Sequence, residues 1–255
     1  MVIIEREYIK DIPALEVVKK DIHQESLPTI IFIHGITSAK EHNLHYAYLL
    51  AEKGFRVILP DTIHHGERQK ELEEKELVTE FWNIVIKTIT ELKTLKEHFV
   101  QHGLTNPNRI GLVGTSMGGI ITLGAITQFP WMKAAVSLMG MPAYEQFSLW
   151  QLDHLKSQGM EIPFTEEEIA NQLMILRDYD LSLYPEKLGQ RPLLFWHGKK
   201  DPIVPYSLTH QFYENIKSSY SQDPERLAFI TDEHAGHKVS REGLLATVDW
   251  FVKYL

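Results

Sequence analysis

Cysteine does not occur in this chain of 255 residues, and neither does a long block of basic residues. Without cysteine the protein can form no disulfide framework and no zinc–thiolate site, and it has no thiol nucleophile. Its 34 acidic and 26 basic side chains give a formal net charge of −8, which argues against a surface for nucleic acids or anionic membranes. We therefore expect a small-molecule partner, no nucleic-acid or membrane partner, and a monomer or homodimer.

The apolar core of a signal peptide is also missing, because charged residues are spread over the whole of residues 1–20. This absence predicts a cytoplasmic protein. One uncharged stretch, between Arg109 and Lys133, is long enough to cross a bilayer as a single helix. Several glycines, Ser116 and Pro130 interrupt it, and they predict a buried strand, a tight turn and a buried helix instead.

Short β-branched runs alternate with longer helical stretches along most of the chain, which is typical of an α/β fold. The runs are continuously apolar, as in a mostly parallel sheet with helices on both faces. They occupy residues 29–35, 55–61, 109–114, 134–139 and 192–198. Residues 3–10 and 15–22 are predicted to be antiparallel edge strands. The clearest helix is predicted over residues 71–102, with an acidic start and Gly103 at its end.

Residues 140–190 depart from this alternation. The stretch is about twice as long as the usual connection between a strand and its helix. Its apolar patterns predict helices near residues 143–158 and 165–178. We interpret it as a small helical cap inserted into a single domain that spans residues 1–255.

The sequence "GTSMG" at residues 114–118 follows a predicted strand and precedes a predicted helix. In that context the motif G-x-S-x-G forces a sharp turn that lifts the serine out of the sheet. The turn lies at the carboxyl ends of the parallel strands, where ligands of such sheets bind. Ser116 is therefore the predicted nucleophile, although the five residues alone would also fit a glycine-rich turn.

A serine hydroxyl needs a base to take its proton and a third group to orient that base. In this fold both follow the serine along the chain, in the order acid and then histidine. Asp201 lies in the loop after the predicted strand at residues 192–198, and His237 lies in a turn after the last predicted strand. His234 is the rival base. We favour His237 because a glycine precedes it and a helix follows it.

Attack by the serine creates an oxyanion, which backbone N–H groups can stabilise. One donor is expected at Met117, directly after the nucleophile. The second is expected in the loop after the strand "IFIHG", at Ile36, with Thr37 as the alternative.

Substrate-binding residues are expected where the cap begins. Helix-spaced apolar residues usually pack in a core, but a cap also covers the site beneath it. The candidates are Met139, Met141, Tyr144, Phe147 and Trp150.

The remaining histidines have simpler explanations. His34 and His197 each precede a glycine at a strand end, and we expect them to brace loops. The pairs at residues 42 and 45 and at residues 64 and 65 lack a third ligand at a telling spacing, so no metal site is predicted.

Five motifs in order resemble those of α/β-hydrolase serine carboxylesterases, in the dienelactone-hydrolase-like and prolyl-oligopeptidase-like branch of single-domain bacterial esterases. They are "HGITSAK" at residues 34–40, "GFRVILPDTIHHGER" at 54–68, "GTSMGG" at 114–119, "HGKKDPIVP" at 197–205 and "AGHKVS" at 235–240. The resemblance covers nearly the whole chain. It implies an α/β-hydrolase fold and no cofactor. The residues implied are Ser116 as nucleophile, Asp201 as acid, His237 as base, and Ile36 and Met117 as oxyanion donors. Dienelactone hydrolases proper use a cysteine nucleophile, so their specific activity is not implied.

These observations predict a serine hydrolase that cleaves carboxylic esters of small, largely apolar acyl groups through an acyl-enzyme. The same three side chains also serve thioesterases and peptidases that act on short peptides, which are alternatives. A non-catalytic binding protein on the same fold is the alternative from another class. The presence of all three residues argues against it.

Overall fold

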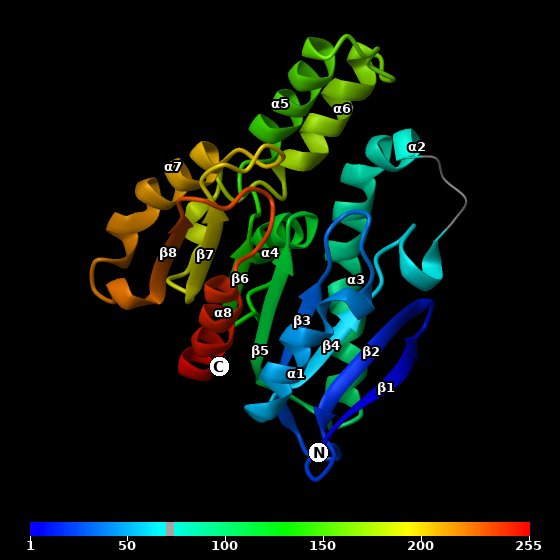
Figure 1. The fold of residues 1–255 in the computed structure, drawn as a ribbon, viewed down its shortest axis with the longest axis vertical. Coiled ribbons are helices and arrows are strands. Elements are labelled where there is room, and N and C mark those ends of the chain that lie inside the picture. Colours follow the sequence, from blue (N-terminus) through cyan, green and yellow to red (C-terminus); the bar gives the residue numbers. More distant parts are fainter. Residues whose placement is uncertain (70–73) are drawn as a thin grey trace.

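A sheet of eight strands forms the centre of the molecule, and helices cover both of its faces (Figure 1). The computed structural model describes residues 1–69 and 74–255. In space the strand order is β1-β2-β4-β3-β5-β6-β7-β8. The strands are β1 Val2–Ile9, β2 Ile12–Lys19, β3 Leu27–Ile33, β4 Arg56–Pro60, β5 Thr105–Thr115, β6 Ala134–Leu138, β7 Leu193–Gly198 and β8 Leu227–Asp232.

Two hydrophobic cores lie on the two faces of the sheet. Helices α1 and α8 contribute to one core, and helices α3, α4 and α7 contribute to the other. The helices are α1 Leu44–Glu52, α2 Glu74–Thr79, α3 Phe81–Gln101, α4 Met117–Gln128, α5 Tyr144–Ser157, α6 Glu166–Arg177, α7 Tyr206–Ile216 and α8 Arg241–Tyr254. Short 3₁₀ helices occupy Lys40–Asn43, Gly66–Arg68, Pro185–Leu188, Lys217–Tyr220 and Pro224–Arg226.

The strands from β3 to β8 are parallel to one another, which confirms the predicted α/β fold. Every residue of β4, β6 and β7 is buried, as expected for strands that are covered on both faces. The parallel arrangement brings the carboxyl ends of these strands to a single edge of the sheet. The loops that follow β3, β5, β7 and β8 therefore meet there.

The N-terminal hairpin of β1 and β2 is antiparallel, as predicted. Of these two strands only β1 lies at an edge of the sheet, because β2 also pairs with β4. The expected range of residues 15–22 is wrong for β2, which begins at Ile12 and ends at Lys19. The chain turns after Lys19, where the N–H of Ile22 donates to the carbonyl oxygen of Lys19 at 3.2 Å.

The prediction of one continuous helix over residues 71–102 is wrong. The described residues form two helices, α2 and α3, with a turn at Glu80. The hydroxyl of Thr79 donates to the carbonyl oxygen of Glu76 at 2.7 Å, a local bond of the kind that bends helices. The predicted start at Glu71 lies outside the described residues.

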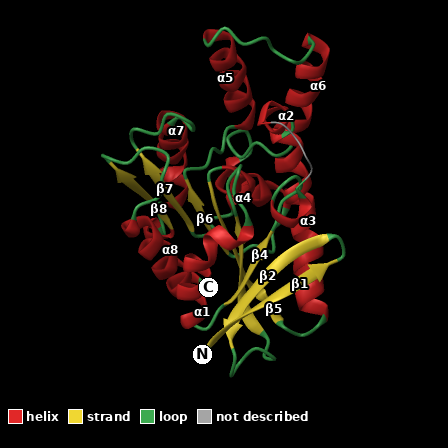
Figure 2. Ribbon diagram, turned by 45° about the vertical axis from the view of Figure 1, so that its right-hand side comes forward, coloured by secondary structure: helices red, strands yellow, loops and turns green. Residues whose placement is uncertain are grey.

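Helices α5 and α6 form a hairpin that projects from the body of the molecule beyond the edge where the strands end (Figures 1 and 2). Both lie within residues 140–190, close to the two helical ranges expected there. A capping box begins α6, because Thr165 and Glu168 exchange hydrogen bonds between side chain and backbone. Among the described residues no helix is both long enough and apolar enough to cross a membrane.

Candidate active site

Ser116 occupies the turn between β5 and α4, with φ of 54° and ψ of −116°, a conformation that is rare for a residue with a side chain. Glycine is required on both sides of it. A Cβ atom at Gly114 would lie 2.2 Å from the backbone of Gly118, and one at Gly118 would lie 2.0 Å from the carbonyl oxygen of Ile33. The motif thus allows strand, turn and helix to pack closely while Ser116 faces outward.

His237 and Asp201 meet Ser116 at this edge of the sheet. His237 Nε2 lies 2.8 Å from Ser116 Oγ, and His237 Nδ1 lies 2.7 Å from Asp201 Oδ2. Asp201 follows β7 and His237 follows β8, as the chain order predicts. The rival base His234 is exposed and is not part of this chain of contacts.

The carboxylate of Asp201 is fully shielded from solvent and is held in its ionised form. Burial alone would raise its pKa. Hydrogen bonds from His197, His237 and the N–H of Val204 outweigh that effect, and they hold the pKa of Asp201 well below its ordinary value. An ionised Asp201 accepts the Nδ1 proton of His237, so Nε2 is left free to take the proton of Ser116.

The structure distinguishes between the two candidates for the second oxyanion donor. The N–H of Thr37 donates to His65 Nε2 at 3.2 Å, so it is already engaged. The N–H of Ile36 has no partner among the described residues, and Ile36 lines the same cavity as Ser116. Met117 is the first residue of α4, where backbone N–H groups have no partner within the helix. Ile36 and Met117 therefore offer the two unengaged N–H groups expected there.

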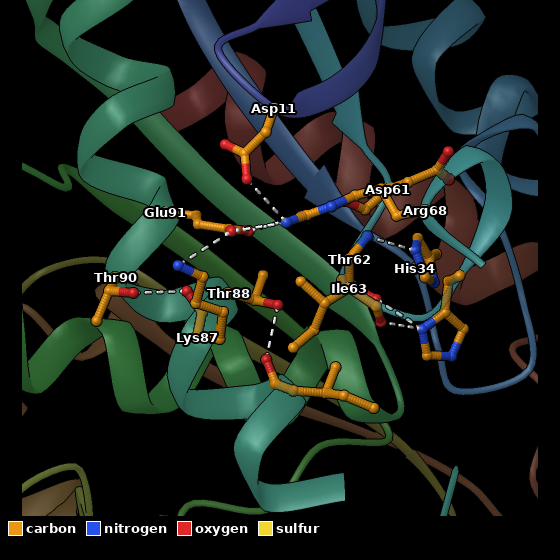
Figure 3. Close-up of polar contacts among 12 residues, drawn as sticks. Asp11, His34, Asp61, Thr62, Ile63, Arg68, Lys87, Thr88, Thr90 and Glu91 are labelled. Atoms are coloured by element: carbon orange, nitrogen blue, oxygen red, sulfur yellow. Dashed lines mark hydrogen bonds and ion pairs between the residues drawn. The ribbon is translucent and has the colours of Figure 1, made fainter. Parts of the chain in front are cut away.

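Two buried histidines, His34 and His65, brace the loops around this site, and Figure 3 shows His34 beside Thr62. The N–H of Thr62 donates to His34 Nε2 at 3.1 Å, and His34 Nδ1 lies 2.8 Å from the carbonyl oxygen of Gly35. Each ring thus accepts a hydrogen bond at Nε2, which only a neutral imidazole can do. Burial lowers the pKa of His34 to about 4 and also lowers the pKa of His65. The expectation that His34 braces a loop agrees with these contacts.

These neutral rings predict a loss of stability in acid. The ordinary pKa of His34 is 6.5, and the folded value is about 4, so unfolding takes up a proton between these two pH values. The free energy of unfolding is therefore expected to fall as the pH drops through this window, by up to roughly 3 kcal/mol for this group. Urea unfolding at several pH values measures it. The free energy of unfolding should depend less on pH in His34→Gln than in the wild type, whereas the exposed control His234→Gln should keep the wild-type dependence. An unchanged pH dependence in His34→Gln would contradict the conclusion that His34 is neutral in the folded protein.

A buried ionic network supports the same loops. Lys40 Nζ lies 2.5 Å from Asp61 Oδ2 and 2.8 Å from Glu67 Oε1, and both Lys40 and Asp61 are shielded from solvent. Arg68 makes two parallel hydrogen bonds to Glu91, of 2.8 and 2.9 Å (Figure 3). The sequence indicated Lys40, Asp61, Glu67 and Arg68 only as parts of family motifs and did not indicate Glu91, because pairing across this distance in the chain leaves no local pattern.

A cavity of about 310 Å³ opens at Ser116. Among the described residues that line it, none carries an Asp, Glu, Lys or Arg side chain. Its aromatic wall is formed by Phe81, Trp82, Phe147, Trp150 and Phe164. Phe147 and Trp150 were expected there. Phe81 and Trp82 were missed, because their helical spacing in α3 is that of ordinary core residues.

The expected contribution of Met139 and Met141 to this cavity is not found, because neither side chain lines it. Met139 packs in the core between the sheet and helices α1 and α8, and Met141 packs in the core of the opposite face. Tyr144 is also fully buried, and its hydroxyl donates to the carbonyl oxygen of Ile120 at 2.6 Å.

One group of three carboxylates in the described part of the chain is close enough to hold a metal ion, namely Glu5, Glu7 and Glu16. It lies on β1 and β2, whereas Ser116 follows β5. Glu16 is paired with the guanidinium of Arg56. The histidines at residues 42, 45, 64 and 65 belong to no such group within residues 1–69 and 74–255.

Comparison with known proteins agrees with this geometry. Residues 41–255 match the model of the prolyl oligopeptidase family. "Putative esterase YitV" of Bacillus subtilis (strain 168) is 55% identical over 255 residues, and the match covers 100% of both chains. "Esterase YjfP" of Escherichia coli (strain K12) is 29% identical over 258 residues, again with 100% of both chains covered. The crystal structure of TT1662 from Thermus thermophilus has a TM-score of 0.77 at 21% identity over 100% of both chains. The predicted resemblance and the α/β-hydrolase fold are thereby confirmed.

Proposed function

This chain belongs to the prolyl oligopeptidase family and is a carboxylesterase-type hydrolase, and we propose that it cleaves esters of small, largely apolar acyl groups through an acyl-enzyme on Ser116. The observation that carries this proposal is the contact chain from Ser116 through His237 to Asp201, which lies at an aromatic-lined cavity whose described lining has no Asp, Glu, Lys or Arg side chain.

In the proposed reaction His237 Nε2 removes the proton of Ser116 Oγ as that oxygen attacks the ester carbonyl carbon. The N–H groups of Ile36 and Met117 stabilise the resulting oxyanion. The intermediate then collapses, the bond to the alcohol oxygen breaks, and His237 returns its proton to the leaving alcohol. A water molecule releases the acid from Ser116 by the same two steps, with His237 again as the base. Asp201 holds the ring of His237 throughout.

The cavity supports a preference for short, uncharged acyl groups. Its volume of about 310 Å³ is at the lower end of the range of about 300–1,000 Å³ that is typical of small-molecule sites. A charged substrate group would lose its hydration there, and the described residues that line the cavity include no Asp, Glu, Lys or Arg side chain to pair with it. We propose that α5 and α6 act as the cap of the site, because Phe147, Trp150 and Gln172 of these helices line the cavity.

Labelling with a fluorophosphonate probe tests the proposed chemistry. We expect labelling at Ser116 alone and none in Ser116→Ala, because the probe reacts only with an activated serine. A wild-type protein that stays unlabelled would support the binding-protein alternative. A matched panel of an ester, a thioester and a short peptide with one acyl group then separates the three hydrolase alternatives by kcat/KM, and we expect the ester to be the best substrate.

The wall of the cavity is expected to limit acyl length. Each buried methylene contributes about 0.8 kcal/mol, or roughly fourfold in kcat/KM, until the chain meets the wall. With nitrophenyl esters from acetyl to palmitoyl, kcat/KM should rise at first and then decline. Trp150→Ala removes part of the wall and should move the optimum to longer chains. Leu149→Ala, on the exposed side of α5, is the matched control and should leave it unchanged. A rise that continues to palmitoyl in the wild type would contradict a closed wall.

A further inference from the structure

The side chain of His197 is buried, and no step of the proposed reaction uses it. It lies near the end of β7, four residues before Asp201, and it is only 1% exposed. Its Nε2 atom lies 3.0 Å from the carbonyl oxygen of Val204 and 3.3 Å from Oδ2 of Asp201. His197 thus contacts both the loop after β7 and the carboxylate that this loop carries.

The contacts of the His197 ring determine where its proton lies. Both neighbours of Nε2 are acceptors, so Nε2 carries a proton and donates it. Nδ1 is buried and has no hydrogen-bond partner within the residues that the structure describes. A proton on Nδ1 would be a buried donor without an acceptor, which is unfavourable. The Nε2–H group therefore donates to the carbonyl oxygen of Val204 and lies in contact with Oδ2 of Asp201.

The two carboxylate oxygens of Asp201 are held differently. Oδ1 accepts hydrogen bonds from the backbone N–H groups of Ile203, at 2.9 Å, and Val204, at 3.0 Å. Oδ2 accepts from His237 Nδ1 at 2.7 Å, and His197 Nε2 is in contact with it at 3.3 Å. The backbone of its own loop therefore fixes the position of Oδ1. The position of Oδ2 depends on the side chains that contact it.

The end of β7 is well placed to supply that donor. A Cβ atom at Gly198 would lie 2.4 Å from the carbonyl oxygen of Gly236, so the strand end packs directly on the loop that carries His237. The N–H of Lys200 also donates to the carbonyl oxygen of Ala235, at 3.0 Å. His197 therefore projects from a rigid strand that contacts the loops of both the acid and the base.

From this geometry we infer that His197 is a positioning residue, whose Nε2–H holds Oδ2 of Asp201 in the orientation that accepts the Nδ1 proton of His237. The inference rests on the proposed function, since it assumes the roles given above to Asp201 and His237. His197 itself touches neither the substrate nor the reacting atoms.

Two variants separate positioning from packing. His197→Gln keeps an N–H donor at a similar reach, whereas His197→Leu keeps similar bulk and removes the donor. His197→Leu removes a donor to a charged carboxylate, and this loss should lower kcat about 10- to 100-fold. KM should change less than about twofold, because the substrate cavity is untouched. His197→Gln should recover most of the lost kcat.

The low-field proton NMR signal of His237 Nδ1–H gives a second readout that does not depend on turnover. The signal should be retained in His197→Gln and should broaden or move in His197→Leu, because Oδ2 is then held by one donor less. Equal losses of kcat in both variants, or an unchanged kcat and signal in His197→Leu, would overturn the inference. A wild-type protein that shows the signal but neither hydrolyses esters nor reacts with fluorophosphonate would instead contradict the proposed function.

Discussion

Ser116→Ala is expected to abolish ester hydrolysis, with kcat lower by as much as about 10⁶-fold, because the nucleophile and its base act as a unit. Alanine removes only the hydroxyl that lies 2.8 Å from His237 Nε2. The fold should be unaffected, since the variant changes no glycine of the turn and leaves the backbone conformation to the same neighbours. The measurement is kcat for a butyryl nitrophenyl ester, with the thermal unfolding temperature as the check on folding.

The two histidines of the last loop provide a matched pair for the same experiment. His237→Ala should lose activity to a similar extent, because no other base lies at Ser116 in the described structure. His234→Ala removes an exposed ring three residues away and should retain wild-type kcat. The reverse pattern would show that the wrong histidine has been assigned as the base.

Lys40→Met is expected to lower the free energy of unfolding by about 3–5 kcal/mol, because it leaves the carboxylate of Asp61 buried without its cation. Both side chains are at most 1% exposed. Burial alone would lower the pKa of Lys40, but its hydrogen bonds to Asp61, Glu67 and Glu41 raise that pKa above its ordinary value. The lysine therefore stays charged throughout the neutral range.

Denaturant unfolding of Lys40→Met beside Lys53→Met tests this expectation. Lys53 is exposed at the end of α1, and its replacement should change the free energy of unfolding by less than about 0.5 kcal/mol. The ester activity of Lys40→Met should also fall, because the ammonium group of Lys40 donates to Asp61 and so helps to hold the loop that carries Ile36. Similar losses of stability in the two variants would show that the buried pair contributes little.

Much of the fold and the three central residues of the site could be predicted from the sequence, because the signals are local. The glycines beside Ser116 are needed by a turn of five residues, and the structure shows the clashes that any side chain would cause there. Apolar runs of strand length identified β3, β4, β6 and β7 to within one or two residues. The order of Asp201 and His237 after Ser116 follows from the order of strands along the chain.

The lining of the cavity and the contacts around it depend on which segments meet in space, and the periodicity of the sequence does not predict those meetings. It predicts which residues are buried, but not whether a buried residue borders a cavity or another side chain. Met139 and Met141 are buried in closed cores, whereas Phe81 and Trp82, in an ordinary helical pattern, line the cavity. Similarly, the sequence favoured Ile36 over Thr37 as the second oxyanion donor but did not show that the N–H of Thr37 is engaged by His65.

The sequence by itself therefore predicted the α/β architecture and that Ser116, Asp201 and His237 would meet, because both depend on short-range backbone geometry and on chain order. Only the tertiary structure distinguishes the N–H groups of Ile36 and Thr37, because His65, 28 residues further on, accepts the N–H of Thr37. It also decided the walls of the cavity and the contact of His197 with Asp201. These depend on side chains from different elements converging at the sheet edge, and the packing of the whole chain sets their distances.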